Sequence, residues 1–302
     1  MNQHILEIHD LKRSYGKKVA LDGVSLSVPA GGVFGLLGGN GAGKTTVLRH
    51  TLGLLAAQSG SVRVFGLDPV ADPVGTLARI GYLSENRDLP DWMRIHQLIS
   101  YSQAFYPNWD PDYAESLRNL FELDPKAFVR SLSRGQRARA GLLVALAHRP
   151  DLLILDEPSS GLDPVVRRDI LGAIIRTIAD EGRTVLFSSH LLDEVERVAD
   201  RIAILHQGRI QLCARMDQVL SGHSRVQLRF SSAVSHFPPA GIWIHSEGSG
   251  HDWSLVAEAG IENIRAEVAS LRAEILSVEP MNLDDIFVAR TAGKPLAAGV
   301  RA

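Results

Sequence analysis

The sequence has a single cysteine, Cys213, among its 302 residues, which excludes an intrachain disulfide. It lacks long hydrophobic runs: a stretch such as 141–147 is far shorter than the roughly 20 residues that a membrane span needs. Neither charge sign dominates, because the sequence has 34 acidic and 32 basic residues. No general attraction to nucleic acid or anionic lipid is therefore expected. The N-terminus shows no basic segment followed by an apolar signal core. These absences predict a cytoplasmic protein, and if it works at a membrane, another chain is expected to cross it.

The composition is that of a folded globular protein, with 45% hydrophobic and 22% charged residues. The length allows one large domain with a smaller partner. Short apolar runs alternate with helical patterns along the middle of the chain, in the order 152–155, 165–178, 184–188, 191–198 and 202–205. This alternation predicts a mostly parallel β-sheet with helices on its faces, which is an α/β fold.

Two other regions of this main domain have a different character. Residues of about 91–149 are predicted to form helices broken by prolines, and we interpret them as an inserted helical subdomain. An antiparallel β element beside the parallel sheet is predicted from three short segments punctuated by glycine and proline, at 5–8, 24–28 and 61–65.

The pattern changes again beyond residue 220, where short alternating strands are followed by an amphipathic helix. These elements are predicted at 225–230, 242–246, 253–257 and, for the helix, near 264–275. We therefore expect a main domain over residues 1–220 and a small C-terminal α/β accessory domain over 221–302.

The strongest motif is a glycine-rich loop with the pattern Gly, four residues, Gly, Lys, Thr. It lies between a predicted strand at 33–37 and a predicted helix at 44–55, which is the context that a phosphate loop requires. Glycines let the backbone turn tightly, so that several N–H groups and the positive end of the helix face a phosphate. The predicted nucleotide-binding residues of this loop are Gly38, Asn40, Gly41, Ala42, Gly43, Lys44, Thr45 and Thr46.

Three side chains of the loop have separate expected roles. Lys44 would bridge the β- and γ-phosphates, Thr45 would offer its hydroxyl to Mg²⁺, and Thr46 would reach the α-phosphate. The alternative is a glycine-rich turn without a ligand, which the strand and helix on either side disfavour.

The apolar run 152–155 ends in two carboxylates, Asp156 and Glu157. A strand that emerges at the carboxyl edge of a parallel sheet brings Asp156 beside the phosphate loop, where it can hold Mg²⁺ through water. Glu157 then lies where it can polarise a hydrolytic water. The alternative is an ordinary strand end, which the phosphate loop upstream makes less favourable.

Four further motifs give the sequence a resemblance to ABC transporter ATPases. Residues 132–136, LSRGQ, resemble the signature motif of this family, which no other phosphate-loop class carries. Residues 160–163, SGLD, look like its D-loop, and His190 after two serines looks like its switch histidine. Tyr15 is similar to the aromatic residue that stacks on adenine, with a packing residue as the alternative. The resemblance covers about residues 5–215.

The resemblance implies site residues beyond the phosphate loop. In this family the signature of one subunit contacts the nucleotide held by the other, a role that falls here to Ser133, Gly135 and Gln136. Asp163 is implied to contribute to the same nucleotide site, and His190 to hold the γ-phosphate.

The resemblance also implies cofactors and partners. It predicts an ATPase subunit that uses ATP and Mg²⁺, pairs head to tail with a copy of itself, and drives a membrane-spanning permease on another chain. Residues 282–287 resemble the closing segment of subunits from exporters whose membrane domain is a separate polypeptide. Export of an unidentified substrate, from the inner face of the cell membrane, is therefore expected.

Three positions depart from the family pattern. Gly39 replaces a common proline without removing a donor, so little effect is expected. Arg134 replaces the first of two signature glycines and adds a cation near the partner's phosphate, with a solvated arginine as an equal alternative. Glu85 replaces the glutamine of the Q-loop. Its carboxylate could contact Mg²⁺ or its water and act in catalysis, yet it adds negative charge beside Asp156 and Glu157.

An aromatic-rich segment follows Glu85, because residues 92–121 hold seven of the 18 aromatic residues. Such density suits a groove that receives a helix of a partner, and the core of a small helical subdomain is the alternative. The spacing of Tyr101 and Phe105 favours the core. Trp92 and Trp109, next to loop residues, are the better interface candidates.

Other classes of function are less well supported. An ABC-type ATPase that acts on DNA would need a coiled-coil insertion or a basic face, and one that acts on ribosomes would normally carry two cassettes. Neither feature appears in the sequence, so no nucleic-acid partner is expected. A binding module without catalysis is disfavoured by the presence of Lys44, Asp156 and Glu157.

Overall fold

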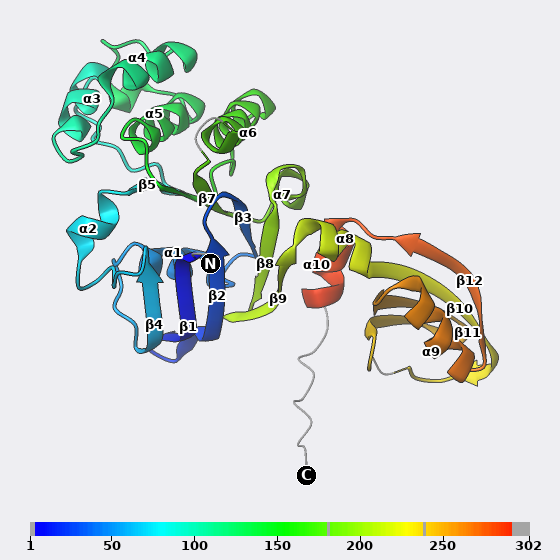
Figure 1. Ribbon diagram of the computed structural model, residues 1–302. Coiled ribbons are helices and arrows are strands. Elements are labelled where there is room, and N and C mark those ends of the chain that lie inside the picture. The colour runs from blue at the N-terminus through cyan, green and yellow to red at the C-terminus, as the bar shows by residue number, and fades with distance from the viewer. Residues whose placement is uncertain (1–3, 180–181, 238–239, 292–302) are drawn as a thin grey trace. The chain divides into compact units, whose positions relative to one another are not determined.

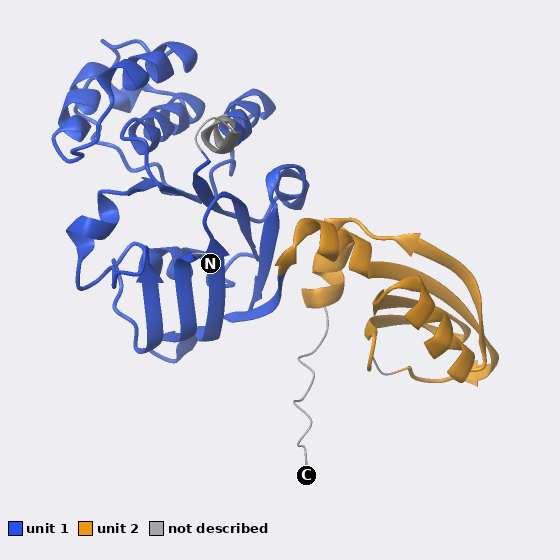
Figure 2. Ribbon diagram, in the orientation of Figure 1, with its two compact units in different colours: residues 1–213 blue, residues 214–302 orange. Residues whose placement is uncertain are grey.

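The computed structural model describes residues 4–179, 182–237 and 240–291. The chain divides into two compact units, unit 1 over residues 1–213 and unit 2 over residues 214–302 (Figure 2). This division lies shortly before the boundary predicted at residue 220, because helix α8 (Met216–Gly222) contacts the first strand of unit 2. The end of the predicted accessory domain, residues 292–302, lies outside the described residues.

A three-stranded antiparallel sheet opens unit 1 (Figure 1). Strand β1 (His4–Tyr15) pairs with both β2 (Lys18–Pro29) and β4 (Ser59–Val64), which gives the order β2-β1-β4. Fully buried and more exposed residues alternate over 24–28, as they do in a strand with one face on a core. The predicted antiparallel β element is confirmed.

The second sheet of unit 1 has six strands in the order β5-β6-β7-β3-β8-β9, and the pairs from β5 to β8 are parallel. All residues of β6 and β7 are buried, which accounts for the apolar runs 152–155 and 185–187 within them. The strands are β3 (Gly32–Leu37), β5 (Ile80–Leu83), β6 (Leu152–Asp156), β7 (Thr184–Ser189), β8 (Arg201–His206) and β9 (Arg209–Arg215). Because parallel strands end at one edge, the loops after β3, β5, β6 and β7 meet there. The predicted α/β core is confirmed.

Helix α1 (Lys44–Thr51) contacts strands of both sheets and ends four residues earlier than predicted. A single hydrophobic cluster therefore joins the two sheets through Val47 and Leu48 of this helix. The other helices beside the sheets are α2 (Pro73–Leu77), α6 (Pro164–Ala179) and α7 (Leu192–Val198).

The segment between β5 and β6 is a helical lobe (Figure 1). It contains α3 (Ile95–Gln103), α4 (Pro111–Leu120), the short 3₁₀ helix η1 (Val129–Ser131) and α5 (Arg134–Leu146). Helix α5 lies directly on β5, and this close approach requires glycine, because a Cβ on Gly81 would come within 2.1 Å of the Ala145 carbonyl oxygen. The lobe is thus in direct contact with the strand that leads to Glu85.

The aromatic residues of the lobe divide differently from the prediction. Trp109 is only 8% exposed, and Tyr106 stacks on it and on the buried His148, so Trp109 is a core residue and not an interface candidate. Tyr101 and Phe105 are 49% and 62% exposed and contact each other edge to face, so their predicted place in the core is wrong. Helical spacing identified a shared face, but that face is turned away from the core.

Unit 2 is a three-stranded antiparallel sheet with helices. The sheet order is β11-β10-β12, and α9 contributes Ile264 and Val268 to its hydrophobic core. Besides α8, the elements are β10 (His223–Val234), β11 (Trp243–Glu258), α9 (Ile261–Ser270), β12 (Ala273–Pro280) and α10 (Leu283–Thr291).

Two elements of unit 2 differ from the prediction. The segments 242–246 and 253–257 belong to one long strand, β11. The helix predicted over 264–275 ends at Ser270, and Arg272 has a left-handed φ of 52°, after which β12 begins at Ala273. Residue 275 has the spacing expected of a helix face that includes 264, 268 and 271, but it lies in β12. A few apolar residues at such spacing do not distinguish a helix from a strand.

Candidate active site

The phosphate loop leaves β3 and enters α1 at the edge where the parallel strands end. Gly41 and Gly43 have left-handed φ values of 76° and 113°. A Cβ on Gly43 would lie 2.7 Å from the carbonyl oxygen of Ala20, so only glycine allows the loop to lie this close to β2. Gly39, the first departure noted in the sequence, has open space around it.

The first turn of α1 is suited to an anion. Gly43 is the N-cap residue, no side chain caps the turn, and no acidic residue lies within it. The first N–H groups of a helix have no intrahelical acceptor and carry the positive end of the helix dipole. The backbone at Lys44, Thr45 and Thr46 can therefore bind a phosphate.

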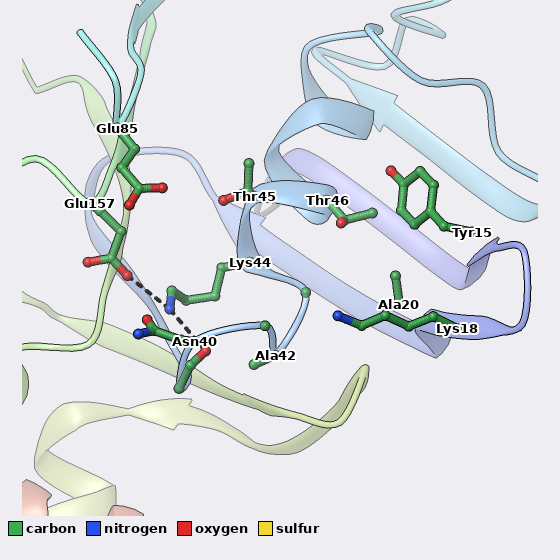
Figure 3. Close-up of a pocket in the computed structure, with 13 residues that line it drawn as sticks. Tyr15, Lys18, Ala20, Asn40, Ala42, Lys44, Thr45, Thr46, Glu85 and Glu157 are labelled. Carbon is green, nitrogen blue, oxygen red and sulfur yellow. Dashed lines mark hydrogen bonds and ion pairs between the residues drawn. The ribbon is translucent and has the colours of Figure 1, made fainter.

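Lys44 is 6% exposed and is held by both the loop and a carboxylate. Its Nζ donates to the carbonyl oxygen of Gly38 at 2.6 Å. The same Nζ lies 2.9 Å from Oε1 of Glu157 (Figure 3). The buried cation and carboxylate neutralise each other, which reduces the cost of burying either one. A phosphate that reaches Lys44 would compete with this carboxylate for the ammonium group.

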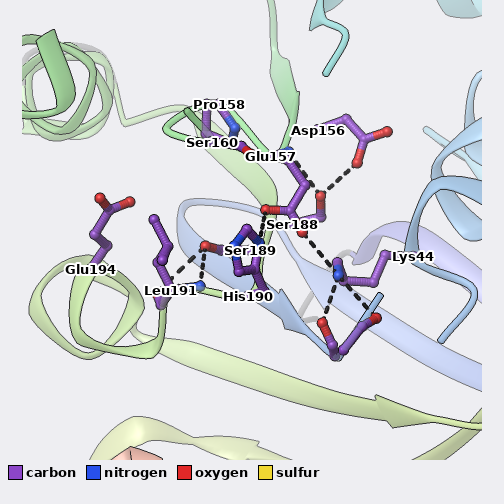
Figure 4. Close-up of polar contacts among 12 residues, drawn as sticks. Lys44, Asp156, Glu157, Pro158, Ser160, Ser188, Ser189, His190, Leu191 and Glu194 are labelled. Atoms are coloured by element: carbon purple, nitrogen blue, oxygen red, sulfur yellow. Dashed lines mark hydrogen bonds and ion pairs between the residues drawn. The ribbon is translucent and has the colours of Figure 1, made fainter. Parts of the chain in front are cut away.

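Glu157 is the first residue after β6 and has a left-handed φ of 48°, which is a strained conformation for a side chain of this size. Its backbone N–H donates to Oγ of Ser188 at 3.0 Å, and its Oε2 lies 2.7 Å from Nδ1 of His190 (Figure 4). The ends of β6 and β7 thus aim this carboxylate between Lys44 and His190.

Asp156 is 1% exposed, and its Oδ1 accepts a hydrogen bond of 2.6 Å from Oγ of Ser188. Burial and, next, the nearby Asp156 carboxylate raise the pKa of Tyr82 to about 12, so Asp156 acts electrostatically on the end of β5. A bound cation would relieve this negative charge.

The oxygen atoms of Glu85, Thr45 and Asp156 suit Mg²⁺ better than they suit a metal ion whose ligands all come from the protein. Glu85 and Thr45 line the same pocket, and Asp156 lies at the end of the neighbouring strand. No group of three His, Cys, Asp or Glu side chains in the described part of the chain could hold a metal ion by itself. Mg²⁺ usually keeps several waters and binds one or two carboxylates plus substrate phosphates.

The pocket has a volume of about 360 Å³ and extends from the carboxylates to the antiparallel sheet. Figure 3 places Glu85 and Glu157 on one side of the phosphate loop and Tyr15 on the other. Tyr15 is 44% exposed, and the Arg13 guanidinium lies 4.9 Å from the centroid of its ring. This exposure leaves the ring available to a ligand. The lining residues are Tyr15, Lys18, Ala20, Gly39, Asn40, Gly41, Ala42, Gly43, Lys44, Thr45, Thr46, Glu85 and Glu157.

Lys18 and Ser188 belong to the site, although the sequence analysis did not single them out. Lys18 shares a strand face with Ala20, and its Nζ would be 4.0 Å from a Cβ on Gly41. The period-two pattern from Lys18 to Ala20 was the signal available for it. Ser188 holds both Asp156 and Glu157, a role that depends on the pairing of β6 with β7.

The signature residues lie apart from this pocket, whose described lining includes none of them. Ser133 is the N-cap of α5: its Oγ accepts from the backbone N–H of Gln136 at 3.2 Å, and the Gln136 side chain accepts from the backbone N–H of Ser133 at 3.0 Å. Gly135 is buried against Val166. These residues present a capped helix N-terminus that their own pocket does not use.

Asp163 forms the N-terminal cap of α6. Its Oδ1 accepts hydrogen bonds from the backbone N–H groups of Val166 and Val165, at 3.1 and 3.0 Å, and these bonds lower the pKa of the Asp163 carboxyl. Among the described residues that line the pocket, Asp163 is absent. The structure therefore shows Asp163 as a helix cap and does not bring it to the phosphate loop.

Comparison with known proteins gives consistent matches. A family model described as "ABC transporter" matches residues 21–160. The "ABC transporter ATP-binding protein YtrB" of Bacillus subtilis is 28% identical over 96% of this chain and 99% of that protein. The "Nod factor export ATP-binding protein I" of Paraburkholderia xenovorans is 36% identical over 69% of this chain and 70% of that protein.

A solved "ATP binding subunit of ABC transporter" has a similar fold. It superposes with a TM-score of 0.66 at 28% identity, over 71% of this chain and 91% of that chain.

Proposed function

Because the chain belongs to the ATP-binding proteins of ABC transporters, we propose that it hydrolyses ATP to drive a membrane-spanning partner on another chain. The arrangement of Lys44, Glu157 and His190 at the phosphate loop carries this proposal, since it combines a phosphate-binding cation with a carboxylate aimed at the same point. ATP turnover by the purified protein, alone and with a co-purified membrane protein, tests it.

The proposed binding mode follows the shape of the pocket. Adenine stacks on Tyr15, Lys18 lies along the nucleotide, and the phosphates enter the first turn of α1, where Lys44 contacts the β- and γ-phosphates. Thr45, Asp156 and Glu85 would hold Mg²⁺, which neutralises phosphate charge when bound.

In the proposed hydrolysis, the γ-phosphate first displaces Glu157 from Lys44. The freed carboxylate then orients a water for attack on the γ-phosphorus and accepts its proton. His190, whose Nδ1 faces Glu157, keeps Nε2 available for a γ-phosphate oxygen. ADP and inorganic phosphate leave as products.

A second copy of the chain would complete the site. Ser133, Gly135 and Gln136 form an N-terminal helix end that can bind an anion, and it lies outside the described lining of its own pocket. In a head-to-tail pair each such end would meet the γ-phosphate held by the other copy, with Arg134 and Asp163 nearby. ATP would hold the pair together and hydrolysis would release it.

The membrane partner is proposed from family membership. No helix in the described segments is long and apolar enough to cross a membrane. We propose a location at the cytoplasmic face through the partner, and export as the direction, since one relative is named for Nod factor export. Unit 2 is proposed as an accessory domain that tunes dimer contact or regulation.

Trp92→Glu is expected to uncouple ATP turnover from the membrane partner. Trp92 is 71% exposed in the segment between Glu85 and α3, so a charge there disrupts an apolar interface without disturbing the core. Turnover stimulated by the partner in vesicles should fall on the order of 10-fold, while basal turnover and nucleotide affinity stay as in the wild type.

Ile261→Glu is the matched control, since Ile261 is also an exposed apolar residue but lies in unit 2. It should leave stimulation unchanged. Full stimulation of Trp92→Glu, or turnover stimulated instead by DNA or ribosomes, would contradict the proposed partner surface.

Glu85→Gln is expected to change the metal dependence of turnover. The Glu85 carboxylate shares the pocket with Thr45, so its loss should raise the Mg²⁺ concentration needed for half-maximal turnover several-fold. A Mg²⁺ titration at saturating ATP measures this. An unchanged titration with weakened coupling would assign Glu85 to a hinge, and unchanged coupling as well would rule out both roles.

A further inference from the structure

A buried arginine outside the sequence motifs joins two loops of the active site. Arg87 follows Glu85 by two residues, is 9% exposed and has a left-handed φ of 54°. Its Nη2 donates hydrogen bonds to the carbonyl oxygens of Pro158 at 3.2 Å and Ser160 at 2.8 Å. The loop after β5 is thereby tied to the turn that begins at Glu157.

That turn is also held from the side of β7. The backbone N–H of Glu157 donates to the carbonyl oxygen of Ser188 at 3.2 Å, and the backbone N–H of Ser160 donates to the carbonyl oxygen of Glu157 at 3.1 Å. The carbonyl oxygens of Pro158 and Ser160 accept hydrogen bonds from Arg87 instead. The strained conformation of Glu157 is therefore fixed between a strand and one arginine side chain.

Burying the Arg87 guanidinium costs desolvation free energy that a purely structural role does not explain. All hydrogen bonds found for its side chain within the described residues go to carbonyl oxygens, and its buried Nε has no partner there. Burial, followed by the nearby Arg134, lowers the pKa of Arg87. An apolar side chain of similar length would fill the same space without burying a charge. This cost favours a role in the site over a role in stability.

We propose that Arg87 is a positioning residue that makes the Glu85 loop and the Glu157 turn move as one unit. The inference rests on the proposed function. The loop runs from Arg87 into α3, so the Arg87 side chain links the helical lobe to the carbonyl groups of the turn that begins at Glu157. Arg87 does not line the pocket and acts only by placing the Glu157 carboxylate.

The first test compares Arg87→Met, which keeps the length without donors, with Arg87→Lys, which keeps the charge and one donor group. Arg87→Met should lower kcat on the order of 10-fold or more, because small displacements of a catalytic group are costly. Nucleotide affinity should stay within about twofold of the wild type, and Arg87→Lys should recover part of kcat. A loss of affinity in proportion to kcat would indicate a general structural role and overturn the proposal.

The second test does not depend on turnover. In the ATP-free protein, hydrogen exchange at the amides of Ser160 and Leu162, which close the turn, should be faster in Arg87→Met. Arg118→Met is the control, since Arg118 also donates to a carbonyl oxygen, that of Leu123, but lies in the helical lobe. It should leave this exchange and kcat unchanged.

The outcomes separate the two hypotheses. A wild-type protein without ATP turnover would refute the proposed function. The exchange experiment would still show whether Arg87 stabilises the turn that begins at Glu157. Turnover in the wild type with unchanged kcat and unchanged exchange in Arg87→Met would refute the role of Arg87.

Discussion

Glu157→Gln should bind ATP and hydrolyse it more slowly by a factor on the order of 10² or more. Glutamine cannot accept the proton of the attacking water, but it retains the hydrogen-bonding shape between Lys44 and His190. Single-turnover kinetics with a separate binding measurement would distinguish the two effects. Because ATP is not consumed, it should also hold the variant as a dimer, which size-exclusion chromatography can detect.

The ion pair in the nucleotide-free protein adds a second expectation. Glu157 competes with phosphate for Lys44, and the neutral amide competes less, so Glu157→Gln should bind ATP at least as tightly as the wild type. Glu194→Gln is a matched control. Glu194 is a buried glutamate like Glu157, but it does not line the pocket, so this variant should hydrolyse ATP at the wild-type rate. Wild-type hydrolysis by Glu157→Gln would show that Glu157 is not the base.

The parts of the site that could be predicted from the sequence are those set by local geometry. The spacing from Gly38 to Thr45 defines a loop and a helix start, and Asp156 and Glu157 follow directly from the end of a buried strand. Ser188 and Arg87 could not be found this way, because each acts on residues that are distant in sequence and adjacent only after folding.

The errors of the sequence analysis have the same physical origin. Periodicity correctly groups Tyr101 and Phe105 on one face, but the neighbours of that face decide whether it is buried. Trp109 is expected at an interface because it lies next to loop residues, yet its side chain is buried. In unit 2 the apolar period continues past Ser270 although the backbone turns at Arg272. Neither the burial of a helix face nor the end of a helix can be predicted from the apolar spacing of one element alone.

Lys44→Ala should weaken ATP binding on the order of 10²-fold, because it removes charge-assisted hydrogen bonds to the phosphates. A second loss adds to the first. Glu157 is almost fully buried, and without Lys44 its carboxylate faces the incoming phosphates without the lysine that pairs with it.

This second loss can be measured separately. In Lys44→Ala combined with Glu157→Gln, the repulsion is removed while the missing contacts are not restored, so the double variant should bind ATP more tightly than Lys44→Ala alone. Equilibrium binding of ATP and ADP by the four proteins completes the cycle. Equal affinity of Lys44→Ala and the wild type would show that the phosphates do not contact Lys44. Strictly additive effects of the two substitutions would show that Glu157 does not compete with phosphate for this cation.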